Sequence, residues 1–294
     1  MNATTSPNIP AAVKLVECPR DAMQGIGPFI PTDVKVAYLN TLLRVGFDTI
    51  DIGSFVSPKA IPQLADTAEV LARIDRSGSR SKLLVIVANE RGAEDAVKQE
   101  SVTYLGYPFS ISETFQLRNT NTSIEGSWGR IARIAELTRN AEKELVVYIS
   151  MAFGNPYGDP WNAEVALHWT NRLVNELGVR IIALSDTVGL ARPEDITSMF
   201  VALIPALPQV EFGAHLHCSP DNWAVKTQAA WDAGCRRFDG AIKGYGGCPM
   251  AEDELVGNLQ MELFVRSLEE RGVRTGLDLE LLDRAVQQAV GVFP

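Results

Sequence analysis

Short apolar segments rich in valine and isoleucine alternate along the chain with longer segments in which apolar residues recur every three or four positions. The short segments are typical of buried strands, and the longer ones of amphipathic helices. The pattern predicts strands at Val13–Glu17, Asp48–Gly53, Lys82–Ala88, Ser101–Tyr107, Leu145–Phe153, Arg180–Ser185, Val210–His217 and Arg237–Ala241. Between them it predicts helices that include Pro31–Gly46, Ile61–Arg73, Asn162–Gly178 and Asn222–Gly234, with glycines at the C-terminal caps.

Strands that alternate with helices in this way predict a parallel sheet with crossover helices. Closed on itself, such a sheet is the α/β fold called the (β/α)8 or TIM barrel, which needs ~250 residues. An open doubly wound sheet is the alternative, but its usual G-x-G-x-x-G fingerprint is absent after the first strand. Extra C-terminal helices are predicted at Glu252–Gly272 and Leu277–Val292. Because no linker or repeat interrupts the chain, we expect one catalytic domain over residues 1–294, with a flexible N-terminus at 1–12.

The charge and composition of the chain argue against several kinds of binding partner. The net charge is −9 and no stretch is rich in lysine and arginine, which argues against a nucleic-acid partner. No apolar run reaches the ~18–20 residues of a membrane helix, and the N-terminus lacks a signal pattern. Four scattered cysteines indicate reduced thiols rather than a disulfide scaffold. We therefore expect a cytoplasmic enzyme with a small-molecule substrate and no membrane partner, assembled as a homo-oligomer, a dimer or a tetramer.

Two histidines, His215 and His217, end the seventh predicted strand in the stretch GAHLHC. Residues two apart on a strand point to the same side, so both imidazoles can face the mouth where barrel enzymes keep their active sites. Asp21 follows the first strand and reaches the same face. One carboxylate and two imidazoles suit a divalent ion. The alternatives are a hydrogen-bonded core pair of histidines and an ordinary loop ion pair between Arg20 and Asp21.

Three further residues invite a functional interpretation. Cys248 lies in a glycine-rich loop after the eighth strand, where it is either a reactive thiol or a small residue packed under the loop. Asp51 is a lone acid within a buried strand and needs either a partner or a role. Asp186 ends the sixth strand as a site residue or as the cap of the next turn. His168 falls in a helical stretch and is interpreted as structural.

Several short sequence stretches follow one another along the chain, at successive predicted strand ends. They are ECPRDAMQ (17–24), SFVSPK (54–59) with Pro62, Gln63, Ala65 and Asp66, Ser112 and Glu113 with Phe115 and Asn119, FG (153–154) with Pro156 and Tyr157, DTVG (186–189), HLH (215–217), GGCP (246–249), and Gly257 with Asn258. Together they resemble the 3-hydroxy-3-methylglutaryl-CoA (HMG-CoA) lyase family over nearly the whole chain.

The resemblance implies a barrel that holds Mg²⁺ or Mn²⁺ through Asp21, His215, His217 and Asn258, and an acyl-CoA substrate. It implies that Arg20 stabilises an enolate and that Cys248 lies on a catalytic loop. Asp51 falls where the family has a glutamate, and Asp186 where it has a catalytic-site aspartate. Gln24, Lys59 and Arg118 are candidate substrate contacts, the last two for a carboxylate or a CoA phosphate.

The chain departs from the family pattern around the proposed pocket. Near the Cys248 loop, Lys243, Tyr245 and Met250 stand where the family has other residues. After His217, the segment CSPDN (218–222) differs from the family's usual sequence. The prediction is therefore a lyase that cleaves HMG-CoA or a related 3-hydroxyacyl-CoA to acetyl-CoA and a keto acid. The alternatives are an acetyl-CoA-dependent condensing enzyme of the isopropylmalate or homocitrate synthase type, and a metal-binding barrel without catalysis.

Overall fold

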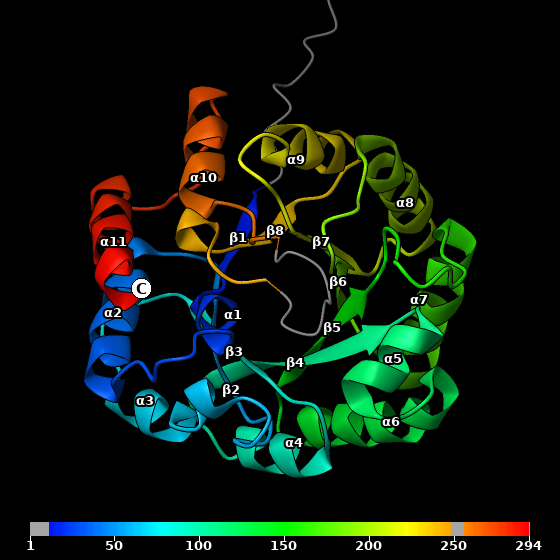
Figure 1. Ribbon diagram of the computed structural model, residues 1–294, viewed down its shortest axis with the longest axis horizontal. Coiled ribbons are helices and arrows are strands. Elements are labelled where there is room, and N and C mark those ends of the chain that lie inside the picture. The colour runs from blue at the N-terminus through cyan, green and yellow to red at the C-terminus, as the bar shows by residue number, and fades with distance from the viewer. Residues whose placement is uncertain (1–11, 248–255, 294) are drawn as a thin grey trace, which may run out of the picture.

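The centre of the molecule is a closed barrel of eight parallel strands that follow one another in chain order (Figure 1). This computed structural model describes residues 12–247 and 256–293. The strands are β1 (Lys14–Glu17), β2 (Thr49–Ser54), β3 (Lys82–Ile86), β4 (Val102–Ser110), β5 (Glu144–Ser150), β6 (Ile181–Asp186), β7 (Glu211–Leu216) and β8 (Arg237–Gly240). The predicted TIM barrel is thereby confirmed, and the open sheet is excluded.

Pairing of the first strand with the last closes the barrel, with Lys14 opposite Arg237 and Glu17 opposite Gly240. Every residue of β2, β6 and β8 is buried. Strands that are covered on both faces favour continuous runs of valine and isoleucine over an alternating pattern. This is why the strands could be recognised from the sequence.

The helices surround the strands as a ring, except that the first of them lies inside the ring (Figure 1). They are α1 (Pro19–Gln24), α2 (Thr32–Val45), α3 (Thr67–Arg73), α4 (Glu90–Val97), α5 (Glu113–Thr120), α6 (Ile124–Asn140), α7 (Ala163–Leu177), α8 (Pro193–Ala206), α9 (Trp223–Asp232), α10 (Met261–Glu270) and α11 (Leu279–Val292), with short 3₁₀ helices η1 (Pro62–Leu64) and η2 (Ile242–Gly244). Gly46 and Gly178 cap α2 and α7 in the left-handed conformation, as predicted. None of the helices within the described ranges is long and apolar enough to cross a membrane.

Two predicted helices begin later than their sequence pattern indicates. The segment Ile61–Arg73 is divided into η1 and α3 at Asp66, whose carboxylate is ion-paired with Lys35 at 2.7 Å. The predicted helix Glu252–Gly272 is wrong over residues 256–260, because α10 begins only at Met261; residues 252–255 lie outside the described part of the chain. Asn258 and Gln260 instead form bridges with His217 and Ala241. Tertiary pairing therefore overrides local helix propensity where the chain returns to the barrel mouth.

Candidate functional site

The short helix α1 places three polar side chains at one cavity. It begins at Pro19, directly after β1, where proline suits the first helical turn. Nη1 of Arg20 donates to Oδ1 of Asp21 and to Oε1 of Gln24, each at 2.8 Å. Nε2 of Gln24 also donates to Oδ1 of Asp21 at 2.8 Å. Two donors therefore fix one carboxylate oxygen of Asp21.

Arg20 is held from the barrel side by Asp51 of β2. Its Nε and Nη2 atoms donate to Oδ2 of Asp51 at 2.9 and 2.6 Å. Burial raises the pKa of Asp51 to about 6, and the charge of Arg20 offsets only part of that effect. Oδ1 of Asp51 has no partner within the described structure. Asp51 thus has the partner that its burial requires, and it acts on the cavity through Arg20.

His215 lies on β7, and His217 follows the end of that strand. Both are buried and line the cavity. Potential ligand atoms of Asp21, His215 and His217 lie within 4.8 Å of one another. Burial, and then the nearby His215, lower the pKa of His217 to about 4, so its imidazole is neutral at pH 7. A neutral imidazole is the form that binds a metal ion.

The electrostatics of Asp21 also suit a cation. Burial opposes ionisation of this carboxyl group, but Arg20 and the two histidines outweigh burial, so that its pKa is lowered. Asp21 is therefore a carboxylate at neutral pH and can contribute a negatively charged oxygen to a metal ion.

Asn258 reaches this cluster from the far end of the chain. Its Nδ2 atom donates to Oδ2 of Asp21 at 2.7 Å and to the carbonyl of Tyr245 at 2.8 Å. Its Oδ1 atom is buried and has no partner in the part of the chain that the structure describes. An unpartnered buried amide oxygen is costly unless a ligand satisfies it. The donor set, two imidazoles, a carboxylate and a free amide oxygen, therefore fits a divalent ion.

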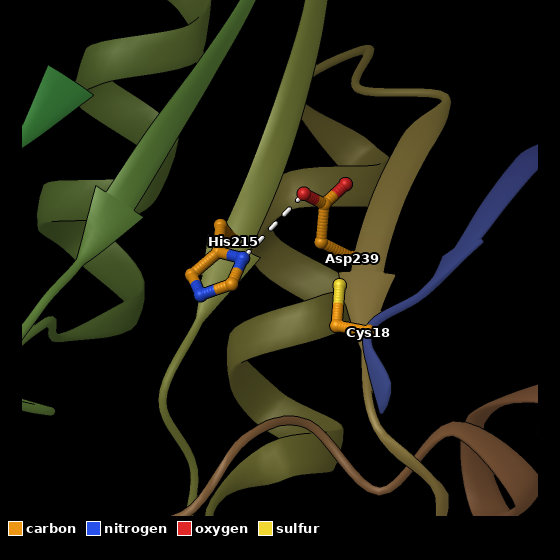
Figure 2. A group of neighbouring side chains, drawn as sticks. All are labelled: Cys18, His215 and Asp239. Carbon is orange, nitrogen blue, oxygen red and sulfur yellow. Dashed lines mark ion pairs between the residues drawn. The ribbon is translucent and has the colours of Figure 1, made fainter. Parts of the chain in front are cut away.

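A second acidic group lies behind His215. Nδ1 of His215 is 3.4 Å from Oδ2 of Asp239 on β8, and the Cys18 thiol completes a buried trio (Figure 2). Burial opposes protonation of His215, but Asp239 outweighs burial and the pKa of His215 is raised. Burial, and then the nearby carboxylates, raise the pKa of the Cys18 thiol well above its usual value. Cys18 is thus a neutral thiol beside the His215–Asp239 pair.

Asp186 lies at the end of β6 and pairs with Lys226 of α9. Nζ of Lys226 is 2.7 Å from Oδ2 of Asp186, and the amide of Ala191 donates to Oδ1 at 3.0 Å. Burial raises the pKa of Asp186, and Lys226 only partly opposes this. These contacts connect Asp186 to α9 and to the turn that follows β6.

The cavity has a volume of about 320 Å³ and two kinds of wall. Arg20, Asp21, Gln24, His215 and His217 form its polar end. The apolar wall comes from the β2–η1 loop (Val56, Ala60, Ile61), from β3 and β4 and the residues next to them (Ile86, Ala88, Pro108), and from Phe115. An apolar cavity with a few convergent polar groups is typical of a small-molecule site.

The remaining predicted site residues lie elsewhere. Neither Asp51 nor Asp186 is among the described residues that line the cavity. Lys59 is exposed on the β2–η1 loop, and Arg118 lies 4.8 Å from the centre of the Tyr157 ring. Cys248 lies outside the described residues. His168 is exposed on α7, edge-on to the ring of Trp169, and is not among the described residues that line the cavity.

Sequence reasoning missed four residues of this region. Asp239 lies 3.4 Å from His215, Lys226 donates to the carbonyl group of His217, and Tyr148 and Ser185 line the cavity. Asp239, like Asp51, is a lone acid in a buried strand, so the sequence held the same signal for both. The sequence held no comparable signal for the other three, because serine, tyrosine and helical lysine are common outside active sites.

Comparison with known proteins shows which family and which solved structures the chain is similar to. The family model described as HMGL-like matches residues 12–290. The cytoplasmic HMG-CoA lyase of Rattus norvegicus is 33% identical over 273 residues, which cover 92% of this chain and 78% of the relative. A 3-hydroxy-3-isohexenylglutaryl-CoA/hydroxymethylglutaryl-CoA lyase of Pseudomonas aeruginosa is 32% identical, with coverage of 97% and 94%.

Among solved structures, an HMG-CoA lyase of Acinetobacter baumannii in complex with coenzyme A and 3-methylmalate superposes with a TM-score of 0.88. It is 29% identical, and the match covers 96% of this chain and 91% of that one. An HMG-CoA lyase of Bacillus subtilis gives the same TM-score at 31% identity, with coverage of 95% and 93%.

Proposed function

Because the chain belongs to the HMGL-like family and is a lyase, we propose that it cleaves HMG-CoA or a related 3-hydroxyacyl-CoA to acetyl-CoA and a keto acid. The observation that carries the proposal is the arrangement of Asp21, His215 and His217 within 4.8 Å of one another, beside Arg20, at the polar end of one cavity. This is the charge distribution that a retro-Claisen cleavage requires, with a cation site and a fixed guanidinium next to each other.

A divalent ion, Mg²⁺ or Mn²⁺, would be held by Asp21, His215, His217 and the free Oδ1 atom of Asn258. When bound, it supplies Lewis-acid polarisation of the substrate oxygens near the bond that breaks. The neutral state of His217 and the ionised state of Asp21 support this assignment.

Arg20 stabilises the negative charge that develops on the thioester oxygen when the bond between C2 and C3 breaks. A charge that is already oriented before the reaction is effective, because it needs no reorganisation during the step. Asp51, Asp21 and Gln24 hold all three nitrogens of the guanidinium and so orient it.

The remaining cavity groups bind and orient the substrate. Tyr148 and Ser185 form part of the cavity wall that contacts the substrate. The apolar wall excludes water from the reacting centre, which strengthens each electrostatic interaction there. Cleavage of the C2–C3 bond also requires that a base take the proton of the C3 hydroxyl group and that an acid protonate the resulting enolate at C2. By its resemblance to the family loop, Cys248 is assigned as that acid.

The test is an assay of the purified protein with Mg²⁺ or Mn²⁺ and a panel of 3-hydroxyacyl-CoA esters that includes HMG-CoA. We expect acetyl-CoA and a keto acid to appear in equal amounts, and a chelator to abolish the reaction. Consumption of acetyl-CoA with keto acids, without cleavage of any ester, would identify a condensing enzyme instead. A metal-loaded protein that is inert to both panels would support the non-catalytic alternative.

A further inference from the structure

Lys226 is a buried lysine whose ammonium group does not line the cavity but contacts the elements that carry the metal set. Its side chain is 3% exposed. Nζ lies 2.7 Å from Oδ2 of Asp186, 3.0 Å from the carbonyl oxygen of Gly189 and 2.9 Å from the carbonyl oxygen of His217. A lysine ammonium has three donors, so these acceptors use all of them.

Each end of this link is held by backbone hydrogen bonding. The turn from Asp186 to Gly189 is closed by the amide of Gly189, which donates to the carbonyl of Asp186 at 3.1 Å. On the other side, His217 pairs with Asn258 in a bridge. Lys226 therefore connects the turn that follows β6 to the backbone of His217.

The same turn also adjoins the ring of His217. Thr187 is inside the turn, and its backbone lies close to the His217 side chain. Metal-binding histidines commonly direct their second ring nitrogen to a backbone carbonyl group, which fixes the tautomer and the ring orientation. The turn is thus connected to the backbone of His217 through Lys226 and adjoins its imidazole directly.

We propose that Lys226 is a positioning residue that sets the place of His217 in the metal set, by tying its carbonyl group to the Asp186–Gly189 turn. The inference rests on the proposed function, because it takes His217 as a ligand of the divalent ion. It also assigns Asp186 a purpose, namely to hold the ammonium group of Lys226 in the orientation that reaches His217.

A purely structural ion pair would give the same contacts, so the test must separate position from stability. Removing one partner of a buried ion pair is destabilising, whereas replacing both partners by apolar residues is often neutral. The double variant Lys226→Met/Asp186→Leu should therefore regain much of the stability that Lys226→Met loses, but it still lacks the donor to His217.

The experiment measures Mn²⁺ binding to the full chain by calorimetry, without substrate, together with urea unfolding. We expect Lys226→Met to raise the Kd for Mn²⁺ about 10–100-fold, the range for residues that support a ligand. The double variant should bind Mn²⁺ as weakly as Lys226→Met does. The control is Lys35→Met, which removes another buried lysine paired with a carboxylate, Asp66, at 2.7 Å. It should lose stability and keep the wild-type Kd.

A wild-type Kd in Lys226→Met, or recovery of the Kd in the double variant, would overturn the inference and leave the proposed function intact. Wild-type protein that binds no Mn²⁺ would overturn the metal site itself, and the inference with it.

Discussion

Nδ1 of His215 lies 3.4 Å from Oδ2 of Asp239, at a point where β7 and β8 place the two residues directly opposite each other. The other ring nitrogen of His215 points away from Asp239 (Figure 2). Both oxygens of Asp239 lack a hydrogen-bond partner within the described ranges. A carboxylate behind an imidazole orients the ring and makes it a more basic ligand. Asp239 is therefore expected to support His215 as Lys226 supports His217.

Asp239→Asn keeps the shape of the side chain but removes its charge. We expect the Kd for Mn²⁺ to rise about 10–100-fold, as measured by calorimetry on protein whose fold is checked by circular dichroism. Cys18→Ala is the matched control, because Cys18 belongs to the same buried trio and should leave the Kd unchanged. A large loss in Cys18→Ala would mean that the ion binds among Cys18, His215 and Asp239 instead.

Arg20→Met should lower turnover by at least about 10²-fold, as the loss of one fixed stabilising charge does in other enzymes, while Mn²⁺ still binds. It should also destabilise the protein, because Asp51 is left buried without its partner. Adding Asp51→Asn is expected to restore stability in urea unfolding but not turnover. Restored turnover in the double variant would show that Arg20 has only a structural role.

Cys248→Ala should lower turnover about 10²–10⁴-fold, the usual contribution of an acid or base, and leave Mn²⁺ affinity unchanged. The control is Cys218→Ala, a buried thiol whose Sγ atom is 3.8 Å from the carbonyl of Leu216. Equal turnover in wild type and Cys248→Ala would remove this residue from the mechanism.

Removal of the metal should lower stability as well as activity. At free Mn²⁺ about 100 times its Kd, binding adds about 2.7 kcal/mol to the free energy of unfolding. Urea titrations with and without Mn²⁺ measure this difference. Asn258→Ala removes the free amide oxygen and the bond to Asp21, so the difference should shrink sharply in this variant. A full Mn²⁺ effect in Asn258→Ala would exclude Asn258 as a ligand.

Gly246 lies directly against two residues of the metal set, Asp21 and Asn258. Its φ angle is +99°, and a Cβ atom here would lie 2.6 Å from Nδ2 of Asn258 and 2.8 Å from the carbonyl oxygen of Asp21. Gly246→Ala should therefore displace both residues and weaken Mn²⁺ binding. Gly78→Ala introduces a similar backbone strain at φ +77° in open space, so it should cost about 1–2 kcal/mol of stability without affecting the Kd. Equal Mn²⁺ affinity in both variants would contradict the close approach.

The strand pattern was readable because parallel strands that are covered on both faces, as β2 and β6 are, are buried along their whole length and so favour apolar residues. Alternation with helices then left few topologies, and the closed barrel was among them. The strand-end positions of Asp21, His215 and His217 followed from the same reasoning, since all active-site residues of a barrel gather at one face.

By itself, the sequence thus determined the barrel, the face that carries the site and a core of three candidate ligands. Only the tertiary structure decided how the carboxylates divide their roles. Asp51 binds Arg20, Asp186 binds Lys226, and Asp239 lies behind His215, although all three are single acids in or at the end of buried strands. The reason is physical. A strand pattern shows that such a residue is buried, but its partner comes from a distant element, and the residues that meet there are set by barrel closure and helix packing.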